Sequence, residues 1–260
     1  MLKTVLGLCG LLSCAAAQSD SVKVKWLEGT PDYLGGVTFG VPWPRGQHLA
    51  NATTFTASGG AELQSWVTAY WPDGSLKWTG HALGATDSPA DEYTITASGP
   101  GNAAFSRLRR QGSNSTSGVQ VRDSGDEIIV DTGKVTATFP RSGDILVSSI
   151  KSGGKVVGNN GRLVLRSQSG TPDDDEDGKP TGIDYFSFAS KIHNTTVSDA
   201  GSQRALVTIH GIHTVDGEAA HADWLPFTVR FYLYANSEAI RIIHTIIYDG
   251  EAKSDFVSGQ

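Results

Sequence analysis

Cysteine is almost absent from this sequence: its 260 residues contain two, Cys9 and Cys14. Both lie before Ala15, so the rest of the chain has no thiol, no disulfide and no cysteine ligand for a metal. Because no disulfide can hold the folded chain together, its stability must come from a buried core.

Long hydrophobic runs are missing as well. The chain begins with Lys3, a short apolar run at Val5–Leu12 and small residues at Ala15–Ala17, which is the layout of a secretory signal. No later segment approaches the ~18 apolar residues of a membrane-spanning helix. We therefore expect a signal peptide at residues 1–17 and a secreted, extracellular protein that is not inserted in a membrane.

An excess of positive charge is also lacking, because the formal net charge is -6. A negative chain has no basic field to attract phosphate backbones, which argues against nucleic acid and anionic membranes as partners. The sequence contains no Gly-x-Ser-x-Gly elbow, no Gly-rich phosphate loop and no dinucleotide fingerprint. Serine hydrolases of that type and nucleotide-binding folds are thereby disfavoured.

Helical periodicity is absent too, whereas short runs with alternating apolar residues recur between Gly, Asp and Asn clusters. The chain is predicted to be all-β. A Gly-, Asn- and Ser-rich linker near residues 99–118 divides it, giving predicted domains at 18–104 and 105–260. The expected strands are Val22–Leu27, Val37–Val41, Leu63–Tyr70, Leu76–Leu83, Tyr93–Ala97, Val119–Arg122, Ile128–Val130, Lys134–Phe139, Ile145–Ile150, Arg162–Ser167, Tyr185–Ala189, Ala205–Thr214, Trp224–Tyr234 and Ala239–Tyr248.

Five segments resemble one known family. Gly35–Gly46, Leu63–Trp66 and Tyr70–Trp78 are similar to the N-terminal domain of the exo-acting rhamnogalacturonan lyases of polysaccharide lyase family 26. Ile129–Pro140 and Phe227–Tyr234 are similar to the central domain of that family. The resemblance implies a small barrel-like (RIFT-type) domain followed by a β-sandwich.

The same resemblance implies a C-terminal α/α toroid, and we expect this chain to end before it, with an incomplete sandwich. The family reaction is β-elimination, in which a base removes the proton next to a uronate carboxylate and a cation stabilises the enolate. No catalytic residue can be carried over to this chain, so we expect no lyase activity from it alone. The expected partners are pectic polysaccharide or the toroid.

Two other functions remain open. The chain could be a stand-alone secreted carbohydrate-binding module, or a structural β protein with no sugar ligand. No cofactor is required by any of the three readings.

Two segments supply candidate substrate-binding residues. Val41–Gly46 holds Trp43 and Arg45 between prolines, and an aromatic face beside a guanidinium suits a uronic sugar. The competing interpretation places Trp43 in the barrel as a core residue. The hairpin around Pro72-Asp-Gly74 adds Trp71, Lys77 and His81.

Pro72 and Gly74 predict a three-residue hairpin loop that closes Trp71 against Ser75. In that register Trp66, Tyr70 and Trp78 share one face of the hairpin, and Lys77 and His81 share the other. We expect the aromatic face to be barrel core and the Lys77/His81 face to be surface.

An acidic stretch is a candidate calcium site. Asp173, Asp175, Asp177 and Asp184 fall on ligand positions of the calcium-loop template, around a glycine at Gly178. A solvated acidic loop is the alternative, because runs of like charge repel one another and stay exposed. Three sequons, at Asn51, Asn114 and Asn194, are candidate glycosylation sites and should be exposed.

Overall fold

The computed structural model describes residues 20–99, 118–169, 183–217, 221–251 and 255–257. Within these segments the fold consists of strands, with one 3-10 turn, η1, at Ser58–Gly60. No described helix is long and apolar enough to cross a membrane. The all-β fold class is confirmed.

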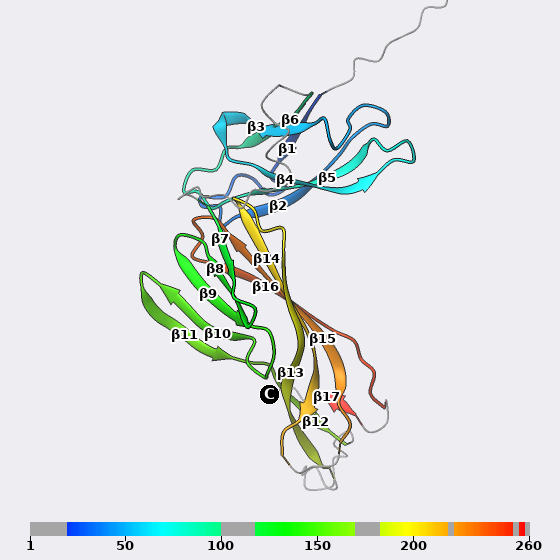
Figure 1. Ribbon diagram of the computed structural model, residues 1–260, viewed down its shortest axis with the longest axis vertical. Helices are drawn as coiled ribbons and strands as arrows, with labels where there is room; N and C mark the ends of the chain where they lie inside the picture. The colour runs from blue at the N-terminus through cyan, green and yellow to red at the C-terminus, as the bar shows by residue number, and fades with distance from the viewer. Residues whose placement is uncertain (1–19, 100–117, 170–182, 218–220, 252–254, 258–260) are drawn as a thin grey trace, which may run out of the picture.

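The N-terminal domain contains two three-stranded sheets, which lie together at the top of Figure 1. Their neighbouring strands are all antiparallel. Val41, Trp43, Leu76, Leu83 and Ile95 form the core of this barrel. One sheet is β1 (Ser21–Lys25), β6 (Glu92–Ser98) and β3 (Thr54–Ala57); the other is β2 (Val37–Pro42), β5 (Leu76–Leu83) and β4 (Gln64–Tyr70).

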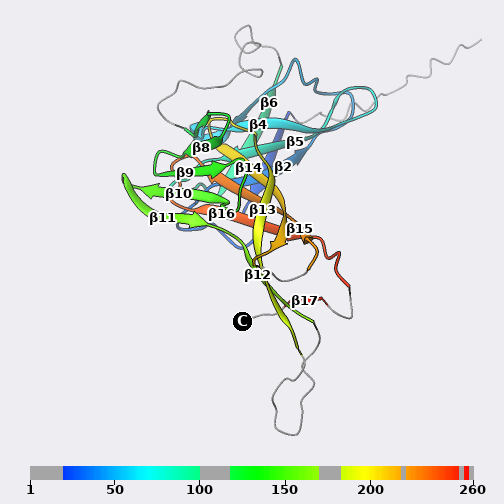
Figure 2. The same cartoon turned by 60° about the horizontal axis from the view of Figure 1, so that its bottom comes forward.

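The second domain packs a five-stranded sheet on a longer six-stranded sheet (Figures 1 and 2). Phe139 of the first meets Phe231 of the second, with ring centroids 5.0 Å apart. The first sheet is β11 (Lys155–Gly161), β10 (Val147–Ser152), β9 (Val135–Pro140), β8 (Glu127–Asp131) and β7 (Gln120–Asp123); the second is β16 (Ile240–Ile246), β15 (Trp224–Tyr234), β14 (Arg204–Val215), β13 (Tyr185–Ser198), β12 (Val164–Gln168) and β17 (Phe256–Val257).

Strict alternation explains why the long strands were predictable. Along β15, Phe227, Val229, Phe231 and Leu233 are buried between the sheets, while Thr228, Arg230 and Tyr232 are half-buried on the other face. Each buried side chain removes apolar surface from water, which favours this packing.

Three strands were not predicted, and one is longer than predicted. β3 is only four residues long, β17 only two, and β11 contains Gly158 and Asn159, which are typical of turns. β13 continues beyond Ala189 to Ser198, because the register shift between Ile192 and Asn194 breaks the alternation that sequence reasoning follows.

The predicted hairpin loop is confirmed. Trp71 N–H donates to Ser75 O at 2.8 Å, and Gly74 has the positive φ of 83° that a left-handed turn residue needs. Trp66 pairs with Gly80, and Ser65 pairs with His81, as expected, but the register shifts at Ala69, which pairs with Trp78 instead of Lys77.

The predicted orientation of the hairpin is wrong. His81 is fully buried, whereas Trp78 is 41% and Tyr70 is 55% exposed. Thr79 and His81 face the barrel interior, where they hydrogen-bond to each other, and the side carrying Trp66 and Trp78 faces outward. Lys77, which was predicted on the same face as His81, is half-buried at the hairpin tip.

Candidate functional site

The buried half of the predicted site forms a hydrogen-bonded chain inside the barrel. Trp43 Nε1 donates to Thr79 Oγ1 at 2.8 Å, and Thr79 Oγ1 lies 2.7 Å from His81 Nε2. His81 Nδ1 lies 2.8 Å from Ser65 Oγ. A neutral imidazole has one donor and one acceptor nitrogen, and each hydroxyl can donate or accept, so Ser65 and Thr79 together satisfy both ring nitrogens of His81.

Burial explains the charge state of His81. It disfavours the imidazolium and lowers the pKa of His81 from 6.5 to about 4. Phe39 stacks on the ring at 5.6 Å, and Phe55 meets it edge-on at 5.2 Å. His81 and Trp43 are thus core residues, and the expectation that His81 lies on the surface is corrected.

The exposed half comes together at the hairpin tip. Arg45 Nε donates to Asp73 Oδ2 at 3.0 Å, and Lys77 Nζ lies 4.7 Å from the centroid of the Trp71 ring. Trp71 Nε1 donates to the backbone oxygen of Trp43 at 3.0 Å, which fixes the ring on the loop beneath it. We call Arg45, Trp71, Asp73 and Lys77 the tip cluster.

Asp73 holds the tip cluster in shape. Ser75 donates to Asp73 Oδ1 through its hydroxyl at 2.6 Å and through its backbone N–H at 3.0 Å. These hydrogen bonds and the Arg45 guanidinium lower the pKa of Asp73, so it stays an anion. The cluster therefore carries two cations and one committed carboxylate.

Two tryptophans that the sequence assigned to the core lie on the outer face of the sheet β2-β5-β4. A Cβ added to Gly80 would lie 2.4 Å from Trp66 Cε2, and one added to Gly40 would lie 3.5 Å from Trp78 Cε3. Each ring therefore lies across a glycine of the neighbouring strand. The signal for this was present in the sequence, because glycine opposite tryptophan marks a place where a ring lies down on the sheet.

The two domains meet through a dense polar contact. Gln64 Oε1 accepts from the backbone N–H groups of Gln203 and Arg204, at 3.0 and 2.7 Å. Arg204 is buried, donates to Thr38 Oγ1 at 2.9 Å, and forms an ion pair with Asp199. Its Cζ lies 4.3 Å from the centroid of the Trp66 ring. The outer face of the barrel sheet thus continues directly onto the second domain.

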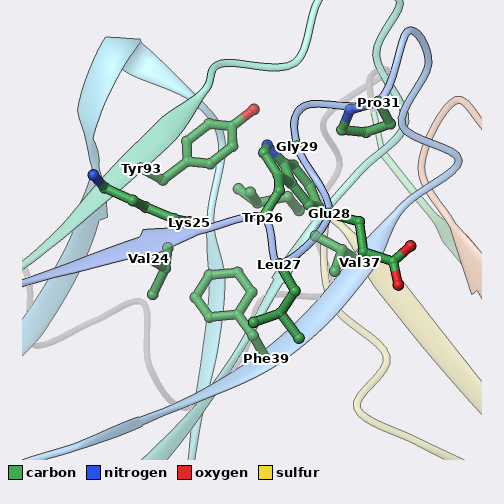
Figure 3. A pocket seen from close by; sticks show the side chains of 11 residues that line it. Val24, Lys25, Trp26, Leu27, Glu28, Gly29, Pro31, Val37, Phe39 and Tyr93 are labelled. Carbon is green, nitrogen blue, oxygen red and sulfur yellow. The ribbon is translucent and has the colours of Figure 1, made fainter.

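A cavity of about 420 Å³ opens at the barrel end beside Leu27, and Figure 3 shows its lining. Trp26, Val37, Phe39 and Tyr93 contribute mostly carbon surface to it. A sugar needs several hydrogen-bonding groups around its hydroxyls, and this lining supplies few of them. The cavity is therefore not a good carbohydrate site.

The calcium prediction falls largely outside the described residues. Asp173, Asp175 and Asp177 lie in the segment 170–182, and Asp184 is exposed at the start of β13, where its N–H donates to Ser169 Oγ. Within the described part of the chain, no cluster of three or more His, Cys, Asp or Glu residues could hold a metal. Calcium binding by this loop stays a prediction.

The sequons are partly described. Asn51 and Asn194 are exposed, as a glycosylation site must be, and Asn114 lies outside the described residues. Attachment of a glycan stays a prediction at all three.

Both domains match known family profiles. Residues 119–260 match the PcRGLX-like protein central beta sandwich domain. Residues 20–98 match the PcRGLX-like N-terminal RIFT barrel domain. This chain belongs to the PcRGLX-like family. The resemblance to the first two domains of the rhamnogalacturonan lyases, and the RIFT-barrel and β-sandwich classes, are thereby confirmed.

A relative from Bacillus subtilis (strain 168), the uncharacterized protein YetA, is 30% identical over 240 residues. The match covers 91% of this chain and 26% of YetA, so the chain spans about a quarter of the length of this relative.

Proposed function

We propose that this PcRGLX-like chain is a secreted, carbohydrate-contacting part of a rhamnogalacturonan lyase-like protein, and that it does not catalyse β-elimination by itself. The observation that carries the proposal is the convergence of Arg45, Trp71 and Lys77 at the hairpin tip, where Arg45 is exposed and Trp71 and Lys77 are half-buried. An aromatic ring beside two cations suits a uronate-containing pectic polysaccharide, whose sugar faces are apolar and whose carboxylates are anionic.

The residues of the tip cluster also support the second half of the proposal, that this chain alone does not catalyse β-elimination. The reaction needs a base beside the cation that stabilises the enolate. Asp73 is the carboxylate of the tip cluster, and its lowered pKa and its bonds to Ser75 and Arg45 make it a weak base. His81, the histidine predicted for the site, is buried within the barrel.

Affinity electrophoresis of the 260-residue protein in gels containing rhamnogalacturonan tests the binding. We expect retardation of the protein, and a loss of about tenfold in affinity for the double variant Arg45→Gln/Lys77→Gln, because two charge-assisted contacts are removed. Lys155→Gln/Arg166→Gln, which removes two exposed cations of the sandwich, is the matched control.

Two results would contradict the proposal. Unretarded migration of the wild-type protein would favour a structural β protein with no sugar ligand. Appearance of the ultraviolet absorbance of an unsaturated uronate on incubation with the polymer would show that the chain is a lyase on its own. Retardation without that absorbance is also expected of a stand-alone carbohydrate-binding module. A longer reading frame at the 3′ end of the transcript would exclude that alternative.

A further inference from the structure

The outer face of the barrel sheet carries two tryptophan rings at neighbouring positions. Gly40 and Gly80 pair directly across β2 and β5, and the rings of Trp78 and Trp66 lie over them, respectively. Trp78 is 41% exposed, and Trp66 is half-buried. Arg204 lies over the Trp66 ring, so Trp78 is the ring of this pair that offers an open face to a ligand. A ring that already lies flat on a sheet loses little conformational entropy when a ligand stacks on it.

Stacking continues from these rings across the domain junction. Arg204 Cζ lies 4.3 Å from the Trp66 centroid and 5.6 Å from the Tyr232 centroid. Arg241 Cζ lies 5.6 Å from the Tyr232 centroid. We call this series the junction stripe: Trp78, Trp66, Arg204, Tyr232 and Arg241.

The far end of the junction stripe has uncompensated positive charge. Arg204 is paired with Asp199, but neither Arg230 nor Arg241 has an ion-pair partner among the described residues. Arg230 shares the solvent-side face of β15 with Tyr232, and Tyr232 pairs with Arg241 of β16. Two guanidinium groups that form no ion pair in the described part of the chain therefore lie diagonally across β15 and β16, although the net charge of the chain is -6.

We infer that the junction stripe is a binding track for an extended acidic polysaccharide that lies across both domains. Apolar faces of the sugar rings stack on Trp78 and beside Trp66, and carboxylates along the same polymer pair with Arg241 and Arg230. Arginine suits this role because its planar fork pairs with a carboxylate in two places at once. The inference rests on the proposed function for its ligand class, and it adds a site separate from the tip cluster.

The buried arginine makes the track rigid. Arg204 is held by Thr38 of the barrel and Asp199 of the sandwich, so Trp66 and Tyr232 keep a fixed separation on either side of it. A polymer bound at both ends of the stripe therefore meets a preorganised surface rather than two domains that must first be oriented. Arg204 is a positioning residue here, since it is too deeply buried to contact the polymer.

Calorimetric titration of the 260-residue protein tests the inference with two ligands, an acidic rhamnogalacturonan and the same polymer after reduction of its carboxyl groups. Trp78→Ala should weaken binding of both polymers by about tenfold, because both present sugar faces to the ring. Arg241→Gln should weaken binding of the acidic polymer by about tenfold and leave the reduced polymer unchanged. It should also make binding of the acidic polymer less sensitive to salt.

Tyr185→Ala and Arg166→Gln are matched controls, since both residues are exposed on β13 and β12, away from the stripe. Thermal unfolding of all four variants checks that the fold is intact. Because Trp78 and Arg241 are exposed, we expect the unfolding midpoints of their variants to stay close to that of the wild type.

The outcomes separate the two proposals. If the stripe variants bind like the wild type while Arg45→Gln/Lys77→Gln does not, the stripe is overturned and the proposed function stands. If the wild type binds neither polymer, both are overturned. The stripe would also be overturned as a polysaccharide track if Trp78→Ala and Arg241→Gln lost no more affinity than the control variants. The same holds if the wild type bound single-stranded DNA as tightly as the acidic polymer.

Discussion

The two faces of the sheet β2-β5-β4 differ in an unexpected direction. The inner face holds a polar chain of Ser65, His81 and Thr79 that ends on Trp43, whereas the outer face holds Trp66 and Trp78 over glycines. Polar groups are stable inside because each has a partner, and aromatic rings are stable outside because a glycine lets each lie flat. Hydrogen-bonding partners and space for a ring therefore decided which side of this sheet faces the core.

Truncating one tryptophan on each face gives the largest expected contrast. Trp43→Ala should lower the free energy of unfolding by about 3–5 kcal/mol, because it opens a cavity in the core and removes the donor to Thr79. Trp78→Ala should cost less than about 1 kcal/mol, because its ring is 41% exposed. Urea unfolding of both variants measures the difference, and equal losses would show that the faces do not differ as described.

Acid should weaken the inner face of this sheet through His81. His81 has a folded-state pKa of about 4, below the 6.5 of an ordinary histidine, so the unfolded chain takes up a proton first as the pH falls. Stability is then lost between about pH 6.5 and pH 4, by roughly 3 kcal/mol from this residue.

His48, His213 and His244 also have pKa values lowered chiefly by burial, so the wild type alone does not isolate His81. The comparison is with His81→Asn, which cannot take up the proton. Unfolding free energies of the two proteins across this pH range should converge at low pH. Parallel curves would mean that His81 is already protonated in the folded state.

Alanine at the two glycines sharpens the contrast on the outer face. Gly80→Ala should cost about 1–3 kcal/mol, because its Cβ would lie 2.4 Å from the Trp66 ring. Gly40→Ala should cost much less, since its Cβ would lie 3.5 Å from Trp78, an ordinary contact distance. Chemical unfolding and the tryptophan emission of each variant report the result, and a Gly40→Ala loss as large as that of Gly80→Ala would contradict it.

Much of the fold could be predicted from the sequence, for reasons visible in particular strands. β15 alternates without interruption, and Pro72 with Gly74 specifies the loop between β4 and β5. β11 and the second half of β13 could not be predicted, because turn-forming residues and a bulge obscure their periodicity.

The candidate site was only half predictable. Arg45, Trp71 and Lys77 were recognised from residue types on two separate segments, and they do lie together. Arg204 and Arg241 were not recognised, because their stacking on Trp66 and Tyr232 depends on strands far apart in the chain. Trp78 was predicted to lie in the core because it is hydrophobic. The local sequence does not indicate which face of the sheet is turned toward the second domain.

The contact between the domains also limits how such proteins can be recombined. The bare Cα of Gly36 lies against the Tyr234 ring, and a Cβ there would be 2.2 Å from Tyr234 Cγ. The Gln64 side chain of the barrel likewise accepts hydrogen bonds from the backbone N–H groups of two sandwich residues. A chimera that takes the barrel from one relative and the sandwich from another would need matching residues on both sides of this contact. The two domains should therefore be exchanged together.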